Sequence, residues 1–568
     1  MIAKNPMLRS GIRSLSGSIK RSIRYNSSSS SSSFSRSNGL PLSIFALSSV
    51  VLFSGGLYLG QSYKQSQFTK SPPDDLFPLT SITPLNVLES PTYGSPQDYQ
   101  KAFDEITAVL GENFVTKADQ VRKDHSDTYW NSHHATPDQK PFAVVYPNST
   151  EQVSQIMKIC FKYRIPVIPF SGGTSLEGHF IPTRGGISID VSNMNNILAV
   201  HKQDLDAVVQ PGVPWEDLGE YLADQNLMFG PDPGPSAQIG GMIANSCSGT
   251  NASRYGTMKD NVLSLTVVLA DGTIIKTRKR PKKSSAGYNL TNLFIGSEGT
   301  LGIVTEATLK LHVKPEHESI AVVSYDTIED AANTVEDITS AGIQVNAVEL
   351  LDDKMMKYIN KGGQTSKEWK EKPTLFFKLG GTENGVKEMI SRVESLAKKN
   401  HSVSFEFAKD EEEKYELWQA RKVALWSTID YGKSIDKDAQ VWTTDVAVPV
   451  SKLAKVLTET KDDMNKSGLL ATLVGHVGDG NFHAFLLYTE KNRHIAETLV
   501  DRMVKRALDN DGTCTGEHGV GYGKREFLIE EVGEDTVSLM RKLKMALDPL
   551  RILNTDKVIH IDPNEISH

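Results

Sequence analysis

Residues 166–179 read PVIPFSGGTSLEGH, and this stretch decides the fold class of the first large segment. A short β-rich run is followed directly by Ser171-Gly172-Gly173-Thr174-Ser175, a turn made of glycines and hydroxyl side chains. Because glycine lacks a Cβ atom, its backbone N–H group can approach a phosphate closely. The stretch therefore predicts a phosphate-binding loop at the end of a buried strand.

The sequence around this loop alternates between strand and helix patterns. From Pro141 the runs FAVVYP, PVIPF and GISIDVS are typical of strands, and residues 149–164 carry apolar side chains at helical spacing. Two further small-residue segments follow, GGMIANSCSG at 240–249 and GSEGTLG at 296–302. Each alone is equally well a tight turn, but together they indicate a long phosphate-containing ligand. None contains the GxGxxG fingerprint, which argues against an ordinary NAD-binding fold.

Composition and charge narrow the class of protein. The chain has 568 residues, of which 39% are hydrophobic and 23% charged, enough for two or three domains with real cores. Three cysteines cannot form a disulfide framework. No acidic residue precedes Asp74. The chain from Asp74 onward therefore carries more negative charge than the net charge of -7 for the whole chain indicates. This balance argues against nucleic acid as a partner.

The first hundred residues predict targeting and anchoring. Residues 1–36 are rich in Ser and Arg and free of Asp and Glu, which indicates a mitochondrial presequence; a disordered basic tail is the alternative. Residues 40–60 are uncharged and long enough for one membrane helix. Residues 61–100 are expected to be a linker and 101–140 a helical lead-in. With its positive end in the matrix, this inner-membrane anchor would place the body in the intermembrane space, whereas cleavage would release it.

The second large segment predicts an α+β domain. Strand-like runs between residues 320 and 488 alternate with amphipathic helices at 327–341 and 382–400. An antiparallel sheet with helices on one face is the simplest packing for this order.

The most specific motif is GHVGDGNFH at 475–483. If Asp479-Gly480 are the central residues of a two-residue hairpin turn, His476 lies directly opposite His483. Two imidazoles so placed can bind one cation, or they can stack without a metal. Glu517 can complete the ligand set while His518 points elsewhere and stays free as a base. Two histidines and a carboxylate suit zinc, with manganese and non-haem iron as alternatives.

Four segments carry a resemblance to a known family. Residues 166–179, 211–234 (PGVPWEDLGEYLADQNLMFGPDPG), 240–272 and 294–311 (FIGSEGTLGIVTEATLKL) resemble the FAD-binding domain of the vanillyl-alcohol oxidase and p-cresol methylhydroxylase superfamily. The resemblance implies bound FAD. The positions expected to contact it are Pro169, Ser171, Gly172, Gly173, Thr174, Ser175, Gly178, Pro235, Gly240, Gly241, Ala244, Asn245, Ser248, Gly249, Glu298, Gly299, Ile303 and Asn554. Some members tether the flavin through a histidine where this chain has Thr174, so non-covalent FAD is expected.

The second segment is similar to the FAD-linked 2-hydroxyacid dehydrogenase branch of that superfamily. This resemblance implies that His476, His483 and Glu517 hold a divalent metal and that His518 takes the substrate's hydroxyl proton. It also implies that Arg421, in Trp418-Gln419-Ala420-Arg421, grips the substrate carboxylate and that Asn481 lies near the substrate. Near the C-terminus the branch's Asn-Pro-Gly-Lys is replaced by Asn-Thr-Asp-Lys at 554–557, so only Asn554 is carried over.

The branch implies a reaction and leaves alternatives open. We expect oxidation of D-lactate to pyruvate by hydride transfer to FAD, with electrons passed to cytochrome c. Thr443 stands where relatives that use D-2-hydroxyglutarate have a lysine, which favours a small monoacid. The alternatives are a D-2-hydroxyglutarate dehydrogenase with another acceptor, a non-catalytic flavin-binding assembly module and a flavin-free metal hydrolase. The expected domains are an FAD-binding domain at 141–315, a substrate or cap domain at 316–530, and a segment at 531–568 that returns to the FAD domain.

Overall fold

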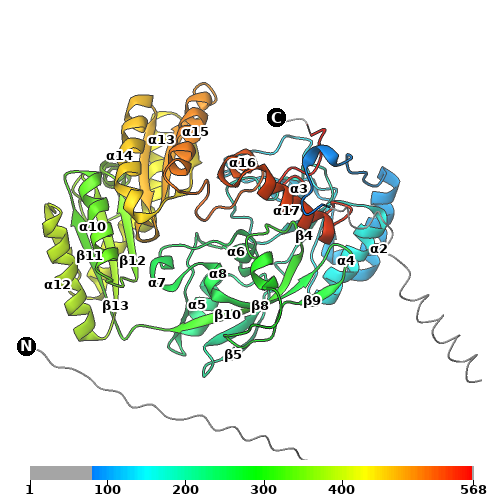
Figure 1. Cartoon of the computed structure of the whole chain (residues 1–568), viewed down its shortest axis with the longest axis horizontal. Helices are drawn as coiled ribbons and strands as arrows, with labels where there is room; N and C mark the ends of the chain where they lie inside the picture. Colours follow the sequence, from blue (N-terminus) through cyan, green and yellow to red (C-terminus); the bar gives the residue numbers. More distant parts are fainter. Residues whose placement is uncertain (1–79, 566–568) are drawn as a thin grey trace, which may run out of the picture. The chain divides into compact units, whose positions relative to one another are not determined.

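The computed structural model describes residues 80–565, and within them the strands form three sheets (Figure 1). The predicted presequence at 1–36 and membrane helix at 40–60 lie outside the described residues. Between residues 80 and 565, every helix is too short or too polar to cross a bilayer. Helix α2 (Pro96–Leu110) begins inside the stretch predicted as linker, capped by Ser95, whose hydroxyl accepts a hydrogen bond from the Asp98 N–H.

The first sheet places the glycine loop. Its strand order is β1-β2-β4-β3, and β3 runs parallel to β4. Helix α4 (Thr150–Tyr163) joins β2 to β3, in agreement with the helix predicted at 149–164, and Ser149 caps its N-terminus. The strand bounds are Val115–Thr116 for β1, Ala143–Val145 for β2, Val167–Phe170 for β3 and Ile187–Asp190 for β4; helix α3 spans Asp119–Asp124.

The second sheet completes the half of the body that is predicted to bind FAD, the FAD-binding half. Strands β5-β6-β10-β8-β9 lie in this order, all antiparallel, and β7 pairs with the far end of β10. The strands are Ile197–His201 (β5), Asp206–Val209 (β6), Leu227–Phe229 (β7), Val262–Val268 (β8), Ile274–Lys276 (β9) and Ile303–Val313 (β10). The helices are Trp215–Ala223 (α5), Ile239–Asn245 (α6), Ala252–Tyr255 (α7), Met258–Asn261 (α8) and Leu290–Phe294 (α9).

The third sheet forms the cap domain and is wholly antiparallel. Its order is β14-β11-β13-β12-β17-β18-β15, with β16 beside β18. The strands are His317–Ser324 (β11), Ala347–Leu351 (β12), Thr374–Gly381 (β13), Ser404–Phe407 (β14), Gln440–Thr443 (β15), Val446–Ala447 (β16), Leu470–Gly475 (β17) and Asn481–Tyr488 (β18). The helices are Ile328–Ser340 (α10), Asp353–Gly362 (α11), Glu383–Lys399 (α12), Glu411–Ile435 (α13), Val450–Ser467 (α14) and Arg493–Leu508 (α15).

The prediction that helices cover one face of this sheet is wrong, because they cover both. Helices α10, α12, α14 and α15 pack on one face around Val323 and Leu350. Helices α11 and α13 pack on the other face around Val322 and Leu351. Adjacent residues of a strand point to opposite faces of the sheet. Val322 and Val323, like Leu350 and Leu351, therefore belong to two separate cores. Both faces therefore carry apolar side chains, and the strands contain few polar positions.

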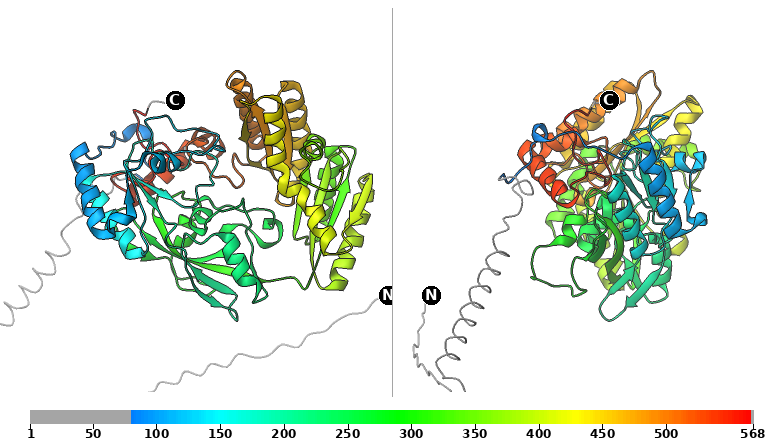
Figure 2. Two further views of the ribbon diagram at one scale, coloured as in Figure 1. Left: turned by 180° about the vertical axis from the view of Figure 1, so that it is seen from behind. Right: turned by 90° about the vertical axis from the view of Figure 1, so that its right-hand side faces the viewer.

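The C-terminal segment lies against the FAD-binding half (Figures 1 and 2). Helix α16 (Arg525–Val532) and helix α17 (Glu534–Leu547) are followed by a stretch in which Leu553 forms a parallel bridge with Val167 of β3. The N–H of Thr83 donates to the carbonyl of Ser538, so the two ends of the described chain also meet. In this return the Asn554 N–H donates to the carbonyl of Val167, the first residue of β3.

Lys544 fastens the returning segment, and its replacement is expected to destabilise the fold. Its buried ammonium donates to Asp548 Oδ2 at 2.6 Å and to the carbonyls of Thr300 and Leu553, each at 2.7 Å. Lys544→Met removes the counter-ion of the buried Asp548 carboxylate, which keeps only the N–H groups of Ile552 and Leu553, and it removes a donor from two carbonyls; this costs about 3–5 kcal/mol. Denaturant unfolding measures this loss. Lys387→Met, which removes an exposed helical ion pair with Glu383, is expected to change stability by less than about 0.5 kcal/mol; equal losses in both variants would contradict the assignment.

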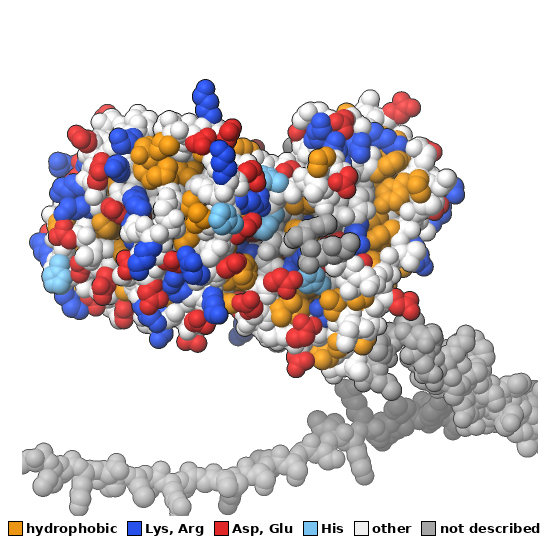
Figure 3. Space-filling view, turned by 90° about the horizontal axis from the view of Figure 1, so that it is seen from above, with side chains coloured by type: hydrophobic (Ala, Val, Ile, Leu, Met, Phe, Trp, Pro, Cys, Tyr) orange, Lys and Arg blue, Asp and Glu red, His pale blue; other side chains and the backbone are white. Residues whose placement is uncertain are grey.

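The surface shown in Figure 3 carries charges of both signs. Lys and Arg side chains lie interspersed with Asp and Glu, with apolar side chains scattered between them. On this face, charge alone therefore marks no docking site for a charged partner.

Candidate active site between the two domains

The glycine loop presents free N–H groups. Gly172 and Gly173 follow β3 and have φ values of +73° and +63°, a region that favours glycine. Within residues 80–565, the backbone N–H groups of residues 172–175 donate to no protein acceptor. Consecutive unpaired N–H groups of this kind form an anion-binding concavity. The loop therefore fits the phosphate of a nucleotide cofactor, as its sequence predicts.

Helix α6 packs tightly beside this loop. A Cβ atom on Gly241 would lie 2.8 Å from the carbonyl oxygen of Ser171, and one on Gly240 would lie 2.7 Å from Pro211. Both distances are shorter than van der Waals contact, so only glycine at these two positions allows the helix to lie this close to the loop and to Pro211. The glycine pair in GGMIAN thus shapes the wall of the pocket next to the loop.

Two adjoining pockets contain most of the predicted flavin contacts. The FAD-domain pocket lies between the loop, α6, the turn before β10 and the C-terminal return. Its predicted lining residues are Pro169, Ser171, Gly173, Ser175, Gly240, Gly241, Ala244, Asn245, Glu298, Gly299, Ile303 and Asn554. The interdomain pocket shares Ser171, Ser175, Gly241 and Asn245 with it and adds the predicted residues Gly172, Thr174 and Pro235.

The interdomain pocket joins the flavin loop to the predicted catalytic residues. Leu425 and Trp426 of α13 line its cap-domain side, and Glu517 and His518 line it as well. A ligand in the FAD-domain pocket can therefore extend toward these two residues without leaving the cavity system. The predicted flavin residues and Glu517, one of the predicted metal ligands, lie in separate segments of the sequence, and the structure brings them to one pocket.

Three predicted flavin contacts line neither pocket. Gly178 packs against Ile181 and Tyr522. The Ser248 hydroxyl and the Gly249 N–H both donate to Glu517 Oε2, at 2.6 and 2.9 Å. These two residues of the FAD-binding half therefore hold a predicted metal ligand. The flavin contacts expected of Gly178, Ser248 and Gly249 stay predictions.

Glu298 lines the FAD-domain pocket, but its carboxylate also has a structural role. Its two oxygens accept from the N–H groups of Val520 and Gly521, at 2.6 and 2.8 Å. These donors follow His518 in the same loop. Glu298 thus fixes the loop that carries the predicted base against the FAD-binding half.

His476, His483 and Glu517 converge on one point, as predicted. Glu517 Oε1 lies 3.1 Å from His476 Nε2 and 3.3 Å from His483 Nε2. One ligand atom from each of the three residues lies within 4.8 Å of the others. This is the donor set of two imidazoles and one carboxylate that zinc and related divalent cations prefer.

The route to this convergence differs from the predicted hairpin. His483 pairs with Val474 rather than with His476. The connection is a 3₁₀ turn, Val477–Asp479, followed by Gly480 at φ +82°. His476 lies two residues beyond Val474 and so stays on the same side of the sheet as His483. The predicted two-residue turn is therefore wrong, but the predicted shared face is correct.

Both histidines are held with Nε2 available for a cation. His483 Nδ1 donates to the carbonyl of Thr444 at 2.9 Å, and His476 Nδ1 lies 2.8 Å from Glu349 Oε1. Hydrogen bonds of this kind set the tautomer of a metal-binding histidine and fix its ring. The residues present therefore fit a divalent metal.

The electrostatics of the cluster also favour a cation. Burial lowers the pKa of His476, but Glu349 and Glu517 together raise it well above its ordinary value. Burial raises the pKa of Glu517, yet His476 and His483 bring it well below its ordinary value. The two carboxylates thus stabilise positive charge on His476, and a bound metal would take the place of the proton on its Nε2.

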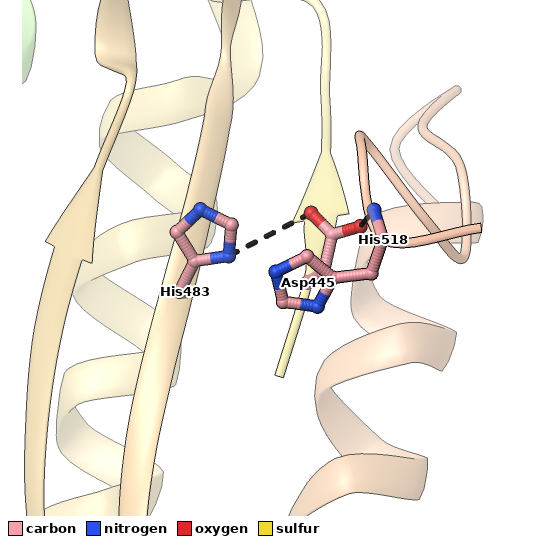
Figure 4. Close-up of side chains that lie close together, drawn as sticks. All are labelled: Asp445, His483 and His518. Carbon is pink, nitrogen blue, oxygen red and sulfur yellow. Dashed lines mark hydrogen bonds and ion pairs between the residues drawn. The ribbon is translucent and has the colours of Figure 1, made fainter. Parts of the chain in front are cut away.

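A second group of potential ligands consists of Asp445, His483 and His518 (Figure 4), and it shares His483 with the first group. Asp445 Oδ2 already accepts from the N–H groups of Glu517 and His518, at 2.8 and 2.9 Å. His483 Nδ1, which faces Asp445, donates to the Thr444 carbonyl. These commitments make the group a support for the loop at 515–518 rather than a second metal site.

His518 lies against the metal cluster without belonging to it. Its ring stacks on His483 with centroids 4.9 Å apart and an interplanar angle of 9°. Its Nδ1 is buried 3.9 Å from Glu177 Oε1, and neither atom has a hydrogen-bond partner within the described residues. Burial raises the pKa of Glu177, but Lys524, His518 and His133 lower it to about 2. An ionised carboxylate therefore faces one ring nitrogen of the predicted base.

Arg421 and Asn481, both expected to bind the substrate, differ in how many side-chain atoms they have left for it. Arg421 Nε donates to Glu349 Oε2 at 2.7 Å, and its two terminal nitrogens have no partner in the described part of the chain. It lies on α13 one helical turn before Leu425, which lines the interdomain pocket, although Arg421 itself does not. Asn481 donates to Asp445 and to the Val446 carbonyl, so only its Oδ1 is left.

Sequence reasoning assigned no role to Glu349, Glu177 or Asp445. Glu349 is a charged residue in the apolar strand AVELL, and it is 0% exposed. A buried carboxylate without a partner is costly, so this pattern alone signals a cation nearby. Glu177 follows the glycine loop in Ser175-Leu176-Glu177-Gly178, where no local pattern distinguishes it from an exposed loop residue.

Two family models, together with the fold and the pocket, define the chain as a two-domain FAD-linked oxidoreductase. Residues 141–278 match the family model described as FAD binding domain, and residues 314–558 match the one described as FAD linked oxidases, C-terminal domain. Among solved structures, p-cresol methylhydroxylase with substrate bound has a TM-score of 0.69 at 18% identity, covering 84% of this chain and 100% of that one. A 4-ethylphenol oxidase from Gulosibacter chungangensis has a TM-score of 0.68 at 19% identity, covering 84% and 99%. These two share the fold.

Curated relatives are much more similar. The mitochondrial D-lactate dehydrogenase (cytochrome) of Kluyveromyces lactis is 60% identical, covering 86% of each chain. D-lactate dehydrogenase (cytochrome) 1 of Saccharomyces cerevisiae is 54% identical, covering 96% of this chain and 95% of the relative. The chain therefore belongs to the family of FAD-linked oxidases that contains the mitochondrial D-lactate dehydrogenases (cytochrome).

Proposed function

We propose that this protein oxidises D-lactate to pyruvate with non-covalent FAD and a divalent metal, most simply Zn²⁺, and passes the electrons to cytochrome c. One observation carries the proposal: Glu517 and His518 line the same pocket as Gly172 and Thr174 of the flavin loop. The relatives named for this activity are 60% and 54% identical to the chain. Substrate, metal and flavin would thus meet in the interdomain pocket.

His518 and Glu177 handle the substrate's hydroxyl proton in this proposal, beside the FAD and the metal. When bound, FAD supplies a two-electron acceptor, and a divalent cation held by His476, His483 and Glu517 lowers the pKa of a substrate hydroxyl. His518, beside the cluster and free of a metal-ligand role, accepts the hydroxyl proton. Glu177 faces the Nδ1 atom of His518 and favours the tautomer that leaves Nε2 as the acceptor. Leu425 and Ile429 of α13 give the cap-domain side of the pocket an apolar wall.

Arg421 orients the substrate carboxylate. Its Nε is fixed on Glu349, so both terminal N–H groups remain for a bidentate pair with a carboxylate. The same arrangement suits any 2-hydroxy acid. The group that the acid carries beyond C2 therefore decides which acid is the substrate.

Thr443 supports a small monoacid as the substrate. It pairs with Phe485, and His483 lies two residues before Phe485 on β18. Since side chains two residues apart share a face, Thr443 lies on the face of the sheet that carries His483. A threonine there offers no charge for a second carboxylate, which disfavours D-2-hydroxyglutarate.

Arg421→Lys is expected to raise KM for D-lactate at least tenfold and to lower kcat. A lysine is a point charge and cannot reproduce the two-pronged hydrogen bonding, and one lost charge-assisted bond is worth about 1.5–3 kcal/mol. Steady-state kinetics with an artificial acceptor measure the change. Lys422→Ala, at the exposed next position on α13, is the control. Unchanged kinetics in Arg421→Lys would remove Arg421 as the carboxylate clamp.

Anaerobic mixing tests the substrate assignment. The purified flavoprotein is mixed in turn with D-lactate, L-lactate and D-2-hydroxyglutarate, and flavin absorbance is followed. Rapid bleaching by D-lactate alone is the expected result. Bleaching only by D-2-hydroxyglutarate would overturn the inference from Thr443 while keeping the mechanism. No bleaching by any acid would favour a non-catalytic flavin-binding module, and absence of bound flavin would favour a metal hydrolase.

The N-terminal sequence and relatives named as mitochondrial support a mitochondrial location. We infer a presequence, one inner-membrane helix and a body in the intermembrane space, where cytochrome c is accessible. Protease treatment of intact mitochondria and of mitoplasts tests this topology. Digestion only after the outer membrane is opened supports it, and protection in mitoplasts contradicts it.

A further inference from the structure

Glu349 is a buried carboxylate in the middle of the cap-domain sheet. It lies in β12, paired with Phe376 of β13, and is 0% exposed. Its neighbours Val348 and Leu350 belong to the core on one face, whereas Leu351 packs on the face covered by α13. Since Glu349 and Leu351 are two residues apart, Glu349 also points to the α13 face. There it meets Arg421.

Glu349 bonds to two residues of the proposed site, Arg421 and His476, between which no hydrogen bond is present. Its Oε2 accepts from Arg421 Nε at 2.7 Å, and its Oε1 accepts from His476 Nδ1 at 2.8 Å. Each oxygen thus serves one donor. The Arg421 guanidinium can only donate and a carboxylate oxygen accepts, so Glu349 is the acceptor that faces both side chains.

We propose that Glu349 is the positioning residue that links the substrate-carboxylate clamp to the metal site. The inference rests on the proposed function, because it assigns Arg421 to the substrate and His476 to the metal. Glu349 holds the His476 ring with Nε2 directed to Glu517 and holds Arg421 with its terminal nitrogens free. One side chain thereby sets the spacing between the substrate carboxylate and the atom that binds its hydroxyl.

Glu349→Gln separates this role from simple packing. Glutamine has the same shape, but its amide offers one acceptor and a pair of donor hydrogens. Both partners of Glu349 are donors here, so the amide can satisfy only one of them. Either the His476 ring or the Arg421 guanidinium then loses its anchor, while the volume of the core is unchanged.

The first readout is metal affinity, which does not depend on turnover. The FAD-loaded full chain is titrated with Zn²⁺ against a chromophoric chelator. Loss of a carboxylate behind a metal-binding histidine typically costs 10–100-fold in affinity, and we expect a drop in that range for Glu349→Gln. Asp352→Asn is the matched control, since Asp352 is equally buried, lies three residues further on and pairs with Lys461 away from the site. It is expected to lower stability and leave Zn²⁺ affinity unchanged.

The second readout is a double-mutant cycle at saturating Zn²⁺. Glu349→Gln is expected to raise KM for D-lactate more than it lowers kcat, because the clamp loses its orientation. In the double variant with Arg421→Lys, KM should be close to that of Arg421→Lys alone, since both changes remove one function. Multiplicative effects on KM would overturn the link to Arg421.

The outcomes distinguish this inference from the proposed function. If the unmodified protein binds no Zn²⁺ and D-lactate bleaches the flavin without it, the proposed metal site fails. If the unmodified protein binds Zn²⁺ and Glu349→Gln binds it equally well, only the role of Glu349 fails. Should Glu349→Gln not fold, Glu349→Asp withdraws the carboxylate by one methylene and is expected to weaken Zn²⁺ binding. Unmodified affinity in that variant would overturn the proposal.

Discussion

His518→Ala is expected to slow flavin reduction by D-lactate by about two to four decades, the usual cost of losing a general base. The ring of His518 stacks on His483 and lines the interdomain pocket, but it contributes no ligand to the His476 cluster. The variant should therefore retain both FAD and metal. Stopped-flow measurement of flavin absorbance under anaerobic conditions gives the rate of the chemical step directly.

The controls for this prediction separate chemistry from folding. Metal content and the flavin spectrum of His518→Ala should match those of the unmodified protein. His494→Ala, which removes an exposed histidine of α15, should leave the rate of flavin reduction unchanged. If His518→Ala reduces its flavin at the unmodified rate, His518 has no role as the base.

His476→Ala is expected to abolish metal binding and, with it, metal-dependent flavin reduction. Binding of a structural zinc ion is worth roughly 10–16 kcal/mol, so losing one ligand of three costs roughly 3–5 kcal/mol, or about two to four decades in affinity. The variant should still bind FAD, because the glycine loop and α6 lie in the other domain. Elemental analysis after dialysis measures the metal, and absorbance measures the flavin.

A histidine outside the site provides the comparison for that variant. His201 pairs with Asp206 on the second sheet, and His201→Ala should keep its metal. Stoichiometric metal in His476→Ala would show that the cation is held elsewhere. Loss of both metal and flavin would instead show that the substitution had unfolded the chain.

Local patterns in the sequence predicted the glycine loop, the helix at 149–164 and the three metal-ligand candidates. Each depends on neighbouring residues: the turn glycines, the spacing of apolar side chains and the polarity of the histidine motif. The hairpin register could not be obtained in this way. Asp479-Gly480 is a strong signal for a two-residue turn, but Val477 is fully buried and the connection winds into a 3₁₀ turn around it. Tertiary packing overrides the local preference here.

Long-range partners account for what the sequence did not reveal. The hydrogen-bond partners of the Glu349 carboxylate, Arg421 and His476, lie 72 and 127 residues away in the sequence, so they are known only once the chain is folded. Ser248 and Gly249 show the same effect, since their contact with Glu517 spans 269 and 268 residues. Helices on both faces of the cap sheet likewise follow from contacts between distant segments rather than from any single strand.

Removal of the metal tests the central claim that flavin and cation serve one site. The FAD-loaded protein is treated with a chelator, dialysed and mixed anaerobically with D-lactate before and after Zn²⁺ or Mn²⁺ is restored, while flavin absorbance and metal content are recorded. The predicted result is bleaching that disappears with the metal and returns with it, at constant FAD content. Bleaching at the full rate in protein shown to be metal-free would contradict the account.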